Sequence, residues 1–131
     1  MYYFLAPIIA WFVAGGLKFL INYIRFGEAK KRIGNGGFPS NHTTIVTTVT
    51  MLIGFHEGFD SPIFGLGVAV IMIVVIDATG LRRHVGYHAA SLNILLNSPS
   101  KHRESMGHTK IEVLGGLVLG ALLAYLLHLW M

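Results

Sequence analysis

Residues 36–42 form the stretch with the clearest chemical potential in this chain. They are Gly-Gly-Phe-Pro-Ser-Asn-His, and an apolar segment follows them. Pro39 favours the first turn of a helix and Ser40 can cap it, so the free N–H groups at that helix start would form an anion pocket. His42 would then lie beside the pocket as a proton donor. The simpler interpretation is a glycine-rich turn with an ordinary capping serine and an interfacial histidine, and these residues alone leave both open.

A second histidine lies near the other end of the chain, with a carboxylate one helical turn further on. His108 and Glu112 are four residues apart, on one face of a helix that we expect to begin at Gly107. A neutral imidazole can attack phosphorus when a carboxylate holds its other N–H, and Glu112 would do this for His108. A protonated imidazole can donate to the leaving oxygen, which is the role we expect for His42. The two histidines therefore predict phosphoryl-transfer chemistry.

Cationic side chains would complete such a site by stabilising charge on the phosphate oxygens. Lys18 and Arg25 lie seven residues apart, hence on one face of a helix. Arg82 and Arg83 follow the third apolar segment. A charge deep in lipid costs about 2.5–3.5 kcal/mol, so Lys18, Arg82 and Arg83 need a role. Together with Arg25 they would form a ring of cations that we expect to bind phosphate. Asp77 either pairs with one of the arginines and orients it, or is a carboxylate at a helix end.

The elements that must position these residues are those of a membrane protein. Of 131 residues, 53% are hydrophobic and 12% are charged, whereas soluble domains have about 25% charged residues. The apolar segments are residues 2–24, 43–55, 62–76 and 113–131. We predict one all-α domain over residues 1–131, a polytopic membrane bundle of four transmembrane helices, with a short interfacial helix at residues 84–97 between the third and fourth. The absence of cysteine excludes thiol catalysis and Cys-ligated metals.

The positive charges predict the topology. If the four segments cross in order, every Lys and Arg falls on one side, and the opposite loop carries His56, Glu57 and Asp60. Basic loops stay cytoplasmic, so we expect a multi-pass cell-membrane protein with both termini outside and the active site at the cytoplasmic face. We expect residues 28–32 to be a solvated charged connector, although anionic lipid would also attract it.

Two further patterns concern partners and metals. Gly116, Gly120 and Ala124 form a small-residue stripe that suits either internal packing or a homodimer. His84 and His88 have the spacing of metal ligands on a helix, but no third ligand or HExxH pattern accompanies them, so we predict no metal. The expected partners are the bilayer and a lipid substrate, and no nucleic acid.

The combined pattern resembles the type 2 phosphatidic acid phosphatase superfamily, which includes the vanadium haloperoxidases, and especially its short divergent membrane branch. That superfamily has a Lys followed seven residues later by Arg-Pro, and then Pro-Ser-Gly-His. Lys18 and Arg25 match the first element, with Phe26 in the place of proline. Residues 39–42 match the second, with Asn41 in the place of glycine.

The third element of the superfamily is Ser-Arg ahead of a His with an Asp four residues on. Here Arg82 or Arg83 resembles the arginine, His108 the nucleophile, and Glu112 replaces the aspartate, with the interfacial helix inserted between them. The signatures of the divergent branch are matched by residues 77–83, 92–93 and 107–113.

A competing match in the third element uses a different histidine. His88 follows Arg82 by six residues and mimics the superfamily spacing, but Leu92 then occupies the position of the acid. Nothing would orient His88, so His108 is preferred.

The resemblance implies a metal-independent lipid phosphate phosphatase without cofactors, which forms a phosphohistidine on His108 with His42 as general acid and a Lys/Arg clamp on the phosphate. One alternative is a catalytically silent lipid-phosphate binding or transport protein with the same cationic pocket. Another is a small structural membrane subunit whose glycine stripe serves a partner helix.

Overall fold

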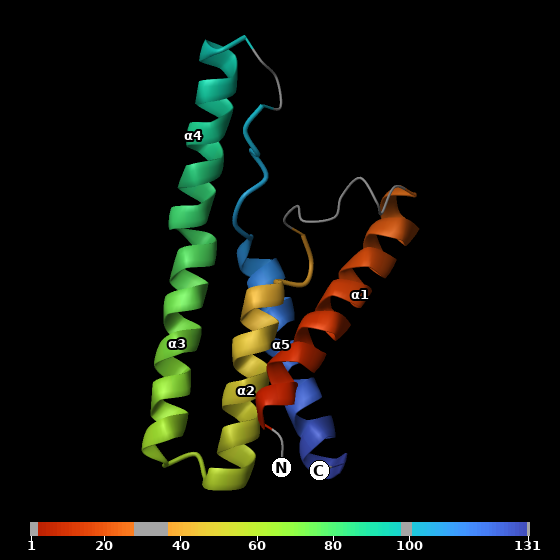
Figure 1. Ribbon diagram of the computed structural model, residues 1–131, viewed down its shortest axis with the longest axis vertical. Helices are drawn as coiled ribbons and strands as arrows, with labels where there is room; N and C mark the ends of the chain where they lie inside the picture. Colours follow the sequence, from red (N-terminus) through yellow and green to blue (C-terminus); the bar gives the residue numbers. More distant parts are fainter. Residues whose placement is uncertain (1–2, 28–36, 98–100, 131) are drawn as a thin grey trace.

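The periodic apolar segments form helices throughout the described part of the chain. The computed structural model describes residues 3–27, 37–97 and 101–130. In chain order its elements are η1 (Tyr3–Leu5), α1 (Ala6–Phe26), α2 (Asn41–Glu57), α3 (Pro62–Thr79), α4 (Leu81–Leu95) and α5 (Lys110–Trp130) (Figure 1). These ranges contain no strand, in agreement with the all-α prediction. The predicted connector at residues 28–32 lies outside the described residues.

Three helical stretches are long and apolar enough to cross a membrane. They are Tyr3–Phe26, Pro62–Leu95 and Lys110–Trp130. Large apolar side chains on their outer surfaces, such as Trp11, Ile73 and Leu126, are more than half exposed, which suits a surface that lipid covers. The prediction of a helical membrane protein is therefore confirmed, whereas that of four full spans is not, because α2 has only 17 residues and is more polar.

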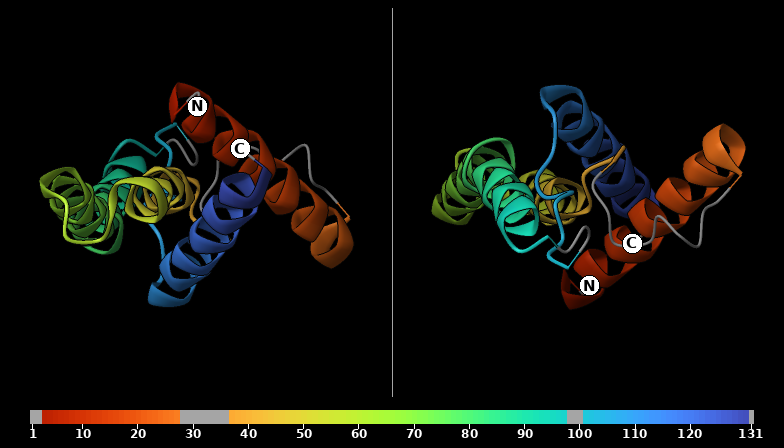
Figure 2. Two further views of the ribbon diagram at one scale, coloured as in Figure 1. Left: turned by 90° about the horizontal axis from the view of Figure 1, so that it is seen from below. Right: turned by 90° about the horizontal axis from the view of Figure 1, so that it is seen from above.

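The threonine-rich helix α2 lies in the middle of the bundle. Figure 2 shows it between α3 on one side and α1 and α5 on the other, and it contacts all three. It carries buried threonines at positions 43, 44, 47, 48 and 50. The hydroxyl of Thr44 donates to Ser40 O (2.9 Å) and that of Thr48 to Thr44 O (2.8 Å). Such bonds back to the preceding turn satisfy hydroxyl groups that have no water available.

The small-residue stripe of α5 packs against α2. Gly116, Gly120 and Ala124 are all buried. A Cβ added at Gly116 would lie 2.8 Å from Ser40 O, and one at Gly120 would lie 2.8 Å from Thr44 O. The two backbones approach this closely only because glycine has no side chain. Of the two roles that the sequence left open for the stripe, the fold of the single chain uses it for internal packing.

The helices α3 and α4 meet end to end at Gly80, where φ is −116° and ψ is −93°. After this one-residue break α4 continues in the direction of α3 and extends past the ends of α2 and α5 (Figure 1). Residues 101–107 return along α4. Asn93 fixes them, because its amide nitrogen donates to His102 O (2.9 Å) and Glu104 Oε1 (2.8 Å), and its oxygen accepts from His102 N (2.9 Å). The predicted interfacial helix is therefore not confirmed as a separate element, since the chain resumes the helix directly after Gly80.

The two ends of the bundle differ in charge. Both chain termini and the turn between α2 and α3 lie at one end (Figure 1). That end carries Glu57 and Asp60, together with a hydrogen bond of 3.1 Å between His56 and His128. Every described Lys and Arg lies in the C-terminal half of α1, in α4 or in residues 101–110, toward the opposite end. The predicted separation of the basic residues from this turn is thus present in the fold.

Candidate active site

Ser40 fixes the start of α2 and thereby the position of His42. Ser40 is the N-cap, and its Oγ accepts a hydrogen bond from Thr43 N (3.4 Å). Because α2 begins at Asn41, Pro39 precedes the cap and does not lie in the first turn as predicted. His42 lies in that turn with an exposed side chain. Ser40 is fully buried, so it holds the start of α2 in place and its side chain does not face a ligand. The free N–H groups and the dipole at this helix start favour a negative charge.

Arg82 links His42 to the end of α3. Its Nε donates to Asp77 Oδ2 (2.5 Å), and its Nη1 lies 3.2 Å from His42 Nδ1. A guanidinium has only donors, so His42 Nδ1 is the acceptor and the proton of the neutral ring is on Nε2. Asp77 therefore pairs with an arginine, which is the first of the two roles considered for it. Arg82 is the arginine of the pair that contacts a histidine.

Arg83 has a different environment. Its Nη2 donates to Tyr87 OH (3.1 Å) on the exposed surface of α4. Its aliphatic stem lies against Gly107, since a Cβ added there would be 2.7 Å from Arg83 Cγ. Arg83 thus packs on the segment that carries His108, while its guanidinium binds a tyrosine.

Glu112 holds the ring of His108 and also starts α5. That helix begins at Lys110, and not at Gly107 as predicted, so His108 precedes it. His108 Nδ1 lies 3.1 Å from Glu112 Oε2, and because a carboxylate only accepts, Nδ1 is the donor and Nε2 keeps its lone pair. The same oxygen accepts from Thr109 N (2.9 Å), and Glu112 N donates to Thr109 Oγ1 (3.3 Å). These two bonds form a capping box.

Backbone contacts with α3 and α2 fix the segment around His108. Gly107 has a φ of +78°, and a Cβ there would lie 2.7 Å from Ala78 O, so only glycine fits without strain. His108 N donates to Ala78 O (2.8 Å), one of the carbonyls near the end of α3. Ser40 N donates to Glu112 O (3.0 Å). The start of α2, the end of α3 and the start of α5 therefore meet at one end of the bundle.

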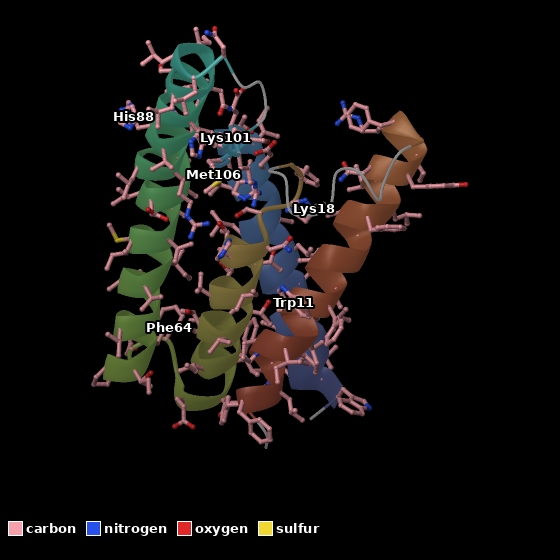
Figure 3. All side chains as sticks on the ribbon, turned by 45° about the horizontal axis from the view of Figure 1, so that its top comes forward. Trp11, Lys18, Phe64, His88, Lys101 and Met106 are labelled. Atoms are coloured by element: carbon pink, nitrogen blue, oxygen red, sulfur yellow. The ribbon has the colours of Figure 1, made fainter. Side chains whose placement is uncertain are left out.

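Lys18 adds a positive charge from α1. It is half-buried, and Figure 3 shows it on the side of α1 that faces the rest of the bundle. It lies close enough to His42, His108 and Glu112 for their charges to interact. Burial lowers the pKa of His108 and the charge of Lys18 lowers it further, while the hydrogen bond that His108 donates to Glu112 opposes both. The lowered pKa favours the neutral imidazole, the form that can attack phosphorus.

Several residues singled out in the sequence lie apart from this cluster. The C-terminal end of α1 leans away from α2 and α5 (Figures 1 and 2), and the guanidinium of Arg25 there lies 5.6 Å from the centre of the Phe26 ring. His88 lies on the side of α4 that faces away from the bundle (Figure 3). The ring of His84 packs edge-on against Tyr87, with centroids 5.9 Å apart. In the described ranges no three His, Asp or Glu side chains gather as metal ligands would.

Sequence reasoning missed the roles of three residues that build the site. The pattern Thr109-Lys-Ile-Glu112 is a capping-box signature and was visible in the sequence. The positive φ of Gly107 depends on its contact with α3. Asn93 binds His102 and Glu104, which lie 9 and 11 positions further along the chain. The sequence carries no local signal for these contacts.

Together, the fold and this cluster define a class of protein: a helical membrane protein with two histidines, a carboxylate and basic side chains gathered where three helix ends meet. The chain matches the Divergent PAP2 family over residues 1–123 and belongs to that family. This confirms the resemblance inferred from the sequence.

A curated relative supports the same assignment. The chain is 32% identical to a protein of Bacillus subtilis (strain 168) described as the uncharacterized membrane protein YuiD, in an alignment that covers 70% of each chain. No solved structure matches the chain.

Proposed function

We propose that this protein is a metal-independent phosphatase that hydrolyses a membrane lipid phosphate through a phosphohistidine on His108. The observation that carries the proposal is the bonding of the two imidazoles. His108 donates through Nδ1 to Glu112 and keeps a lone pair on Nε2, while His42 is bound to Arg82. Membership of the Divergent PAP2 family supports a phosphatase-related activity. The hydrogen bond between Ser40 N and Glu112 O (3.0 Å), which joins the segments that carry the two histidines, further supports their sharing one substrate.

In the proposed first step His108 Nε2 attacks phosphorus and the P–O bond to the lipid breaks. His42, as imidazolium, donates its Nε2 proton to the leaving oxygen. Its Nδ1 is protonated in this form and no longer accepts from Arg82, so Arg82 Nη1 is released to donate to the phosphate. Bound phosphate would favour this charged form of His42, because a nearby negative charge stabilises a cation. Arg82 and Lys18 would stabilise the charge that develops on the other phosphate oxygens.

The second step releases the phosphate. His42, now neutral, takes a proton from water, the water oxygen attacks phosphorus, and the P–N bond to His108 breaks. Glu112 keeps the His108 ring in the tautomer that can react in both steps. No step requires a metal ion or a cofactor.

The charge asymmetry of the bundle supports a cytoplasmic location for the site in the cell membrane. Basic residues lie at the site end of the fold, and such residues are retained on the cytoplasmic side. Both chain termini would then be outside, because they lie at the opposite end.

Phosphate release from a panel of lipid phosphates in the presence of chelator tests the proposal. We expect turnover by the native protein, no turnover by His108→Ala and a fall of about 10²–10⁴-fold in His42→Ala. His88→Ala is the matched control, since this histidine faces away from the bundle (Figure 3). Full activity in the His108 and His42 variants would refute the mechanism.

The second candidate function is a catalytically silent protein that binds or transports lipid phosphates. The position of Arg25 favours this silent protein. Arg25 lies apart from the two histidines, so the group of cations that would bind phosphate has one member fewer than the family resemblance implies. This candidate predicts binding of vanadate or lipid phosphate without phosphate release. Turnover that depends on His108 would exclude it.

A further inference from the structure

An apolar groove runs along the bundle between α1 and α5. Its volume is about 360 Å³, and every side chain that lines it is apolar. Leu17 of α1 and the loop residues Phe38 and Pro39 line one part, and residues of α5 from Ile111 to Leu122 line the rest. The groove lies where the C-terminal half of α1 leans away from α5 (Figure 1).

Three residues that line the groove directly precede residues of the candidate active site in the chain. Leu17 precedes Lys18 in the chain, Pro39 precedes Ser40, and Ile111 precedes Glu112. The second residue of each pair is part of the site described above. The bond between Ser40 N and Glu112 O (3.0 Å) joins the two elements that form this end of the groove. A molecule in the groove would therefore have one end beside the histidines.

The length of the groove matches one leaflet of a bilayer. At 1.5 Å per residue, the stretch of α5 from Ile111 to Leu122 is about 16 Å long. The hydrocarbon core of a bilayer is about 30 Å thick, so each leaflet contributes about half of that. The end of the groove formed by Leu17, Pro39 and Ile111 adjoins Lys18, Ser40 and Glu112 in the chain, and the head group of such a lipid would lie at this end.

A close contact forms one wall of the groove. A Cβ added at Gly115 would lie 2.1 Å from the ring of Phe38, so the ring lies directly on the backbone of α5. The volume is near the lower limit of sites that take small organic ligands, about 300–1,000 Å³. This space suits one chain better than two.

We propose that the groove binds a single hydrocarbon chain of the lipid whose phosphate occupies the cationic site. The inference rests on the proposed function for the position of the phosphate. It adds a substrate class, a lipid phosphate with one chain held against α5, and it makes the groove the part of the protein that recognises the chain.

Photoaffinity labelling tests the proposal independently of turnover. Two probes carry the same long chain with a diazirine at mid-chain, one ending in a phosphate and the other in an alcohol. In protein reconstituted in lipid nanodiscs, we expect the phosphate probe to label the α5 peptide that lines the groove about tenfold more than the alcohol does. Equal labelling by both probes would show ordinary bilayer lipid in the groove and would overturn the proposal.

Variants of α5 locate the binding surface. Leu119→Trp and Val118→Trp place a bulky ring in the groove, and each should reduce labelling by the phosphate probe about tenfold. Val118 is 53% exposed, so its replacement leaves the packed interior intact. Leu126→Trp on the same helix is the matched control, because Leu126 is 60% exposed and does not line the groove. An equal loss in the control would overturn the proposal.

The two proposals fail in different ways. If labelling follows the pattern above but no lipid phosphate is hydrolysed, the phosphatase function fails and the groove stands. If long-chain and short-chain phosphates are hydrolysed with the same relative kcat/KM in native protein and Val118→Trp, the groove fails and the phosphatase stands.

Discussion

Replacing Glu112 separates its role in folding from its proposed role in catalysis. Glu112 Oε2 accepts from both Thr109 N (2.9 Å) and His108 Nδ1 (3.1 Å). Glu112→Ala removes both bonds. Losing the cap costs about 0.5–2 kcal/mol of stability, and losing a hydrogen bond to a charged group costs about 1.5–3 kcal/mol. Glu112→Gln keeps an acceptor for the cap, because Gln also serves at this position of a capping box.

The two variants should therefore differ in stability but not in activity. We expect Glu112→Gln to stay within about 1 kcal/mol of native stability. Its turnover should fall by about 10²–10⁴-fold, because an amide does not favour the required tautomer and charge of His108. Thermal unfolding in detergent and phosphate release from a lipid phosphate measure the two quantities.

Thr109→Ala is the matched control for the cap alone. It removes the acceptor of Glu112 N (3.3 Å) and leaves the bond between Glu112 and His108 in place. We expect about 0.5–2 kcal/mol of lost stability with turnover retained. Native turnover in Glu112→Gln would refute the reasoning, since Glu112 would then be a capping residue only.

Four further predictions concern the same cluster. Gly107→Ala should cost about 1–3 kcal/mol in thermal stability and abolish turnover, because φ is +78° there; native stability and turnover would contradict this. Arg82→Lys should lower kcat/KM by about 10²–10³-fold while Arg83→Lys keeps most activity, and equal effects would show that the histidine contact of Arg82 is unimportant. The kcat should fall with decreasing pH as His108 is protonated. Lys18→Met should shift this fall to higher pH, because removing the positive charge raises the pKa of His108. An unchanged pH profile would show that the charge of Lys18 does not act on His108. Folding lowers the pKa of His108 below its unfolded value of about 6.5, so the unfolded chain binds a proton at this histidine more readily than the folded chain. The free energy of unfolding should therefore fall as the pH drops below about 6.5, and thermal unfolding measured against pH tests this.

The sequence predicted the helices well because their apolar segments are long. The third apolar segment, residues 62–76, is observed as a helix over Pro62–Thr79. The helix starts were less accurate, since α5 begins three residues after the predicted Gly107. The capping box at Thr109 sets that start, and this local signal was in the sequence.

The course of α4 could not be predicted from its own residues. Its composition is that of an interfacial helix, with polar residues and a few leucines. Its direction depends on the single-residue break at Gly80 and on the clamp of Asn93 to His102 and Glu104. These are tertiary contacts between segments whose pairing has no pattern in the sequence.

For the site, the spacing paired His108 with Glu112 correctly, although His108 precedes α5 and the side chain of Glu112 reaches back to it at the helix start. The sequence left Arg82 and Arg83 equivalent, because neighbours on a helix differ only in the direction they face. Contacts distinguish them, Arg82 with His42 and Arg83 with Tyr87. The position of Arg25 depends on how α1 tilts, and packing against other helices determines the tilt.

The threonines of α2 have a consequence for the biogenesis of the protein. A 17-residue helix with this many hydroxyl groups has little tendency to partition into lipid by itself. Its insertion must rely on burial against neighbouring helices, above all α5, which follows it in the chain and contacts it most extensively. A ribosome-bound chain that ends before α5 would therefore leave His42 on an unanchored segment, and the candidate site would form only after α5 has been synthesised.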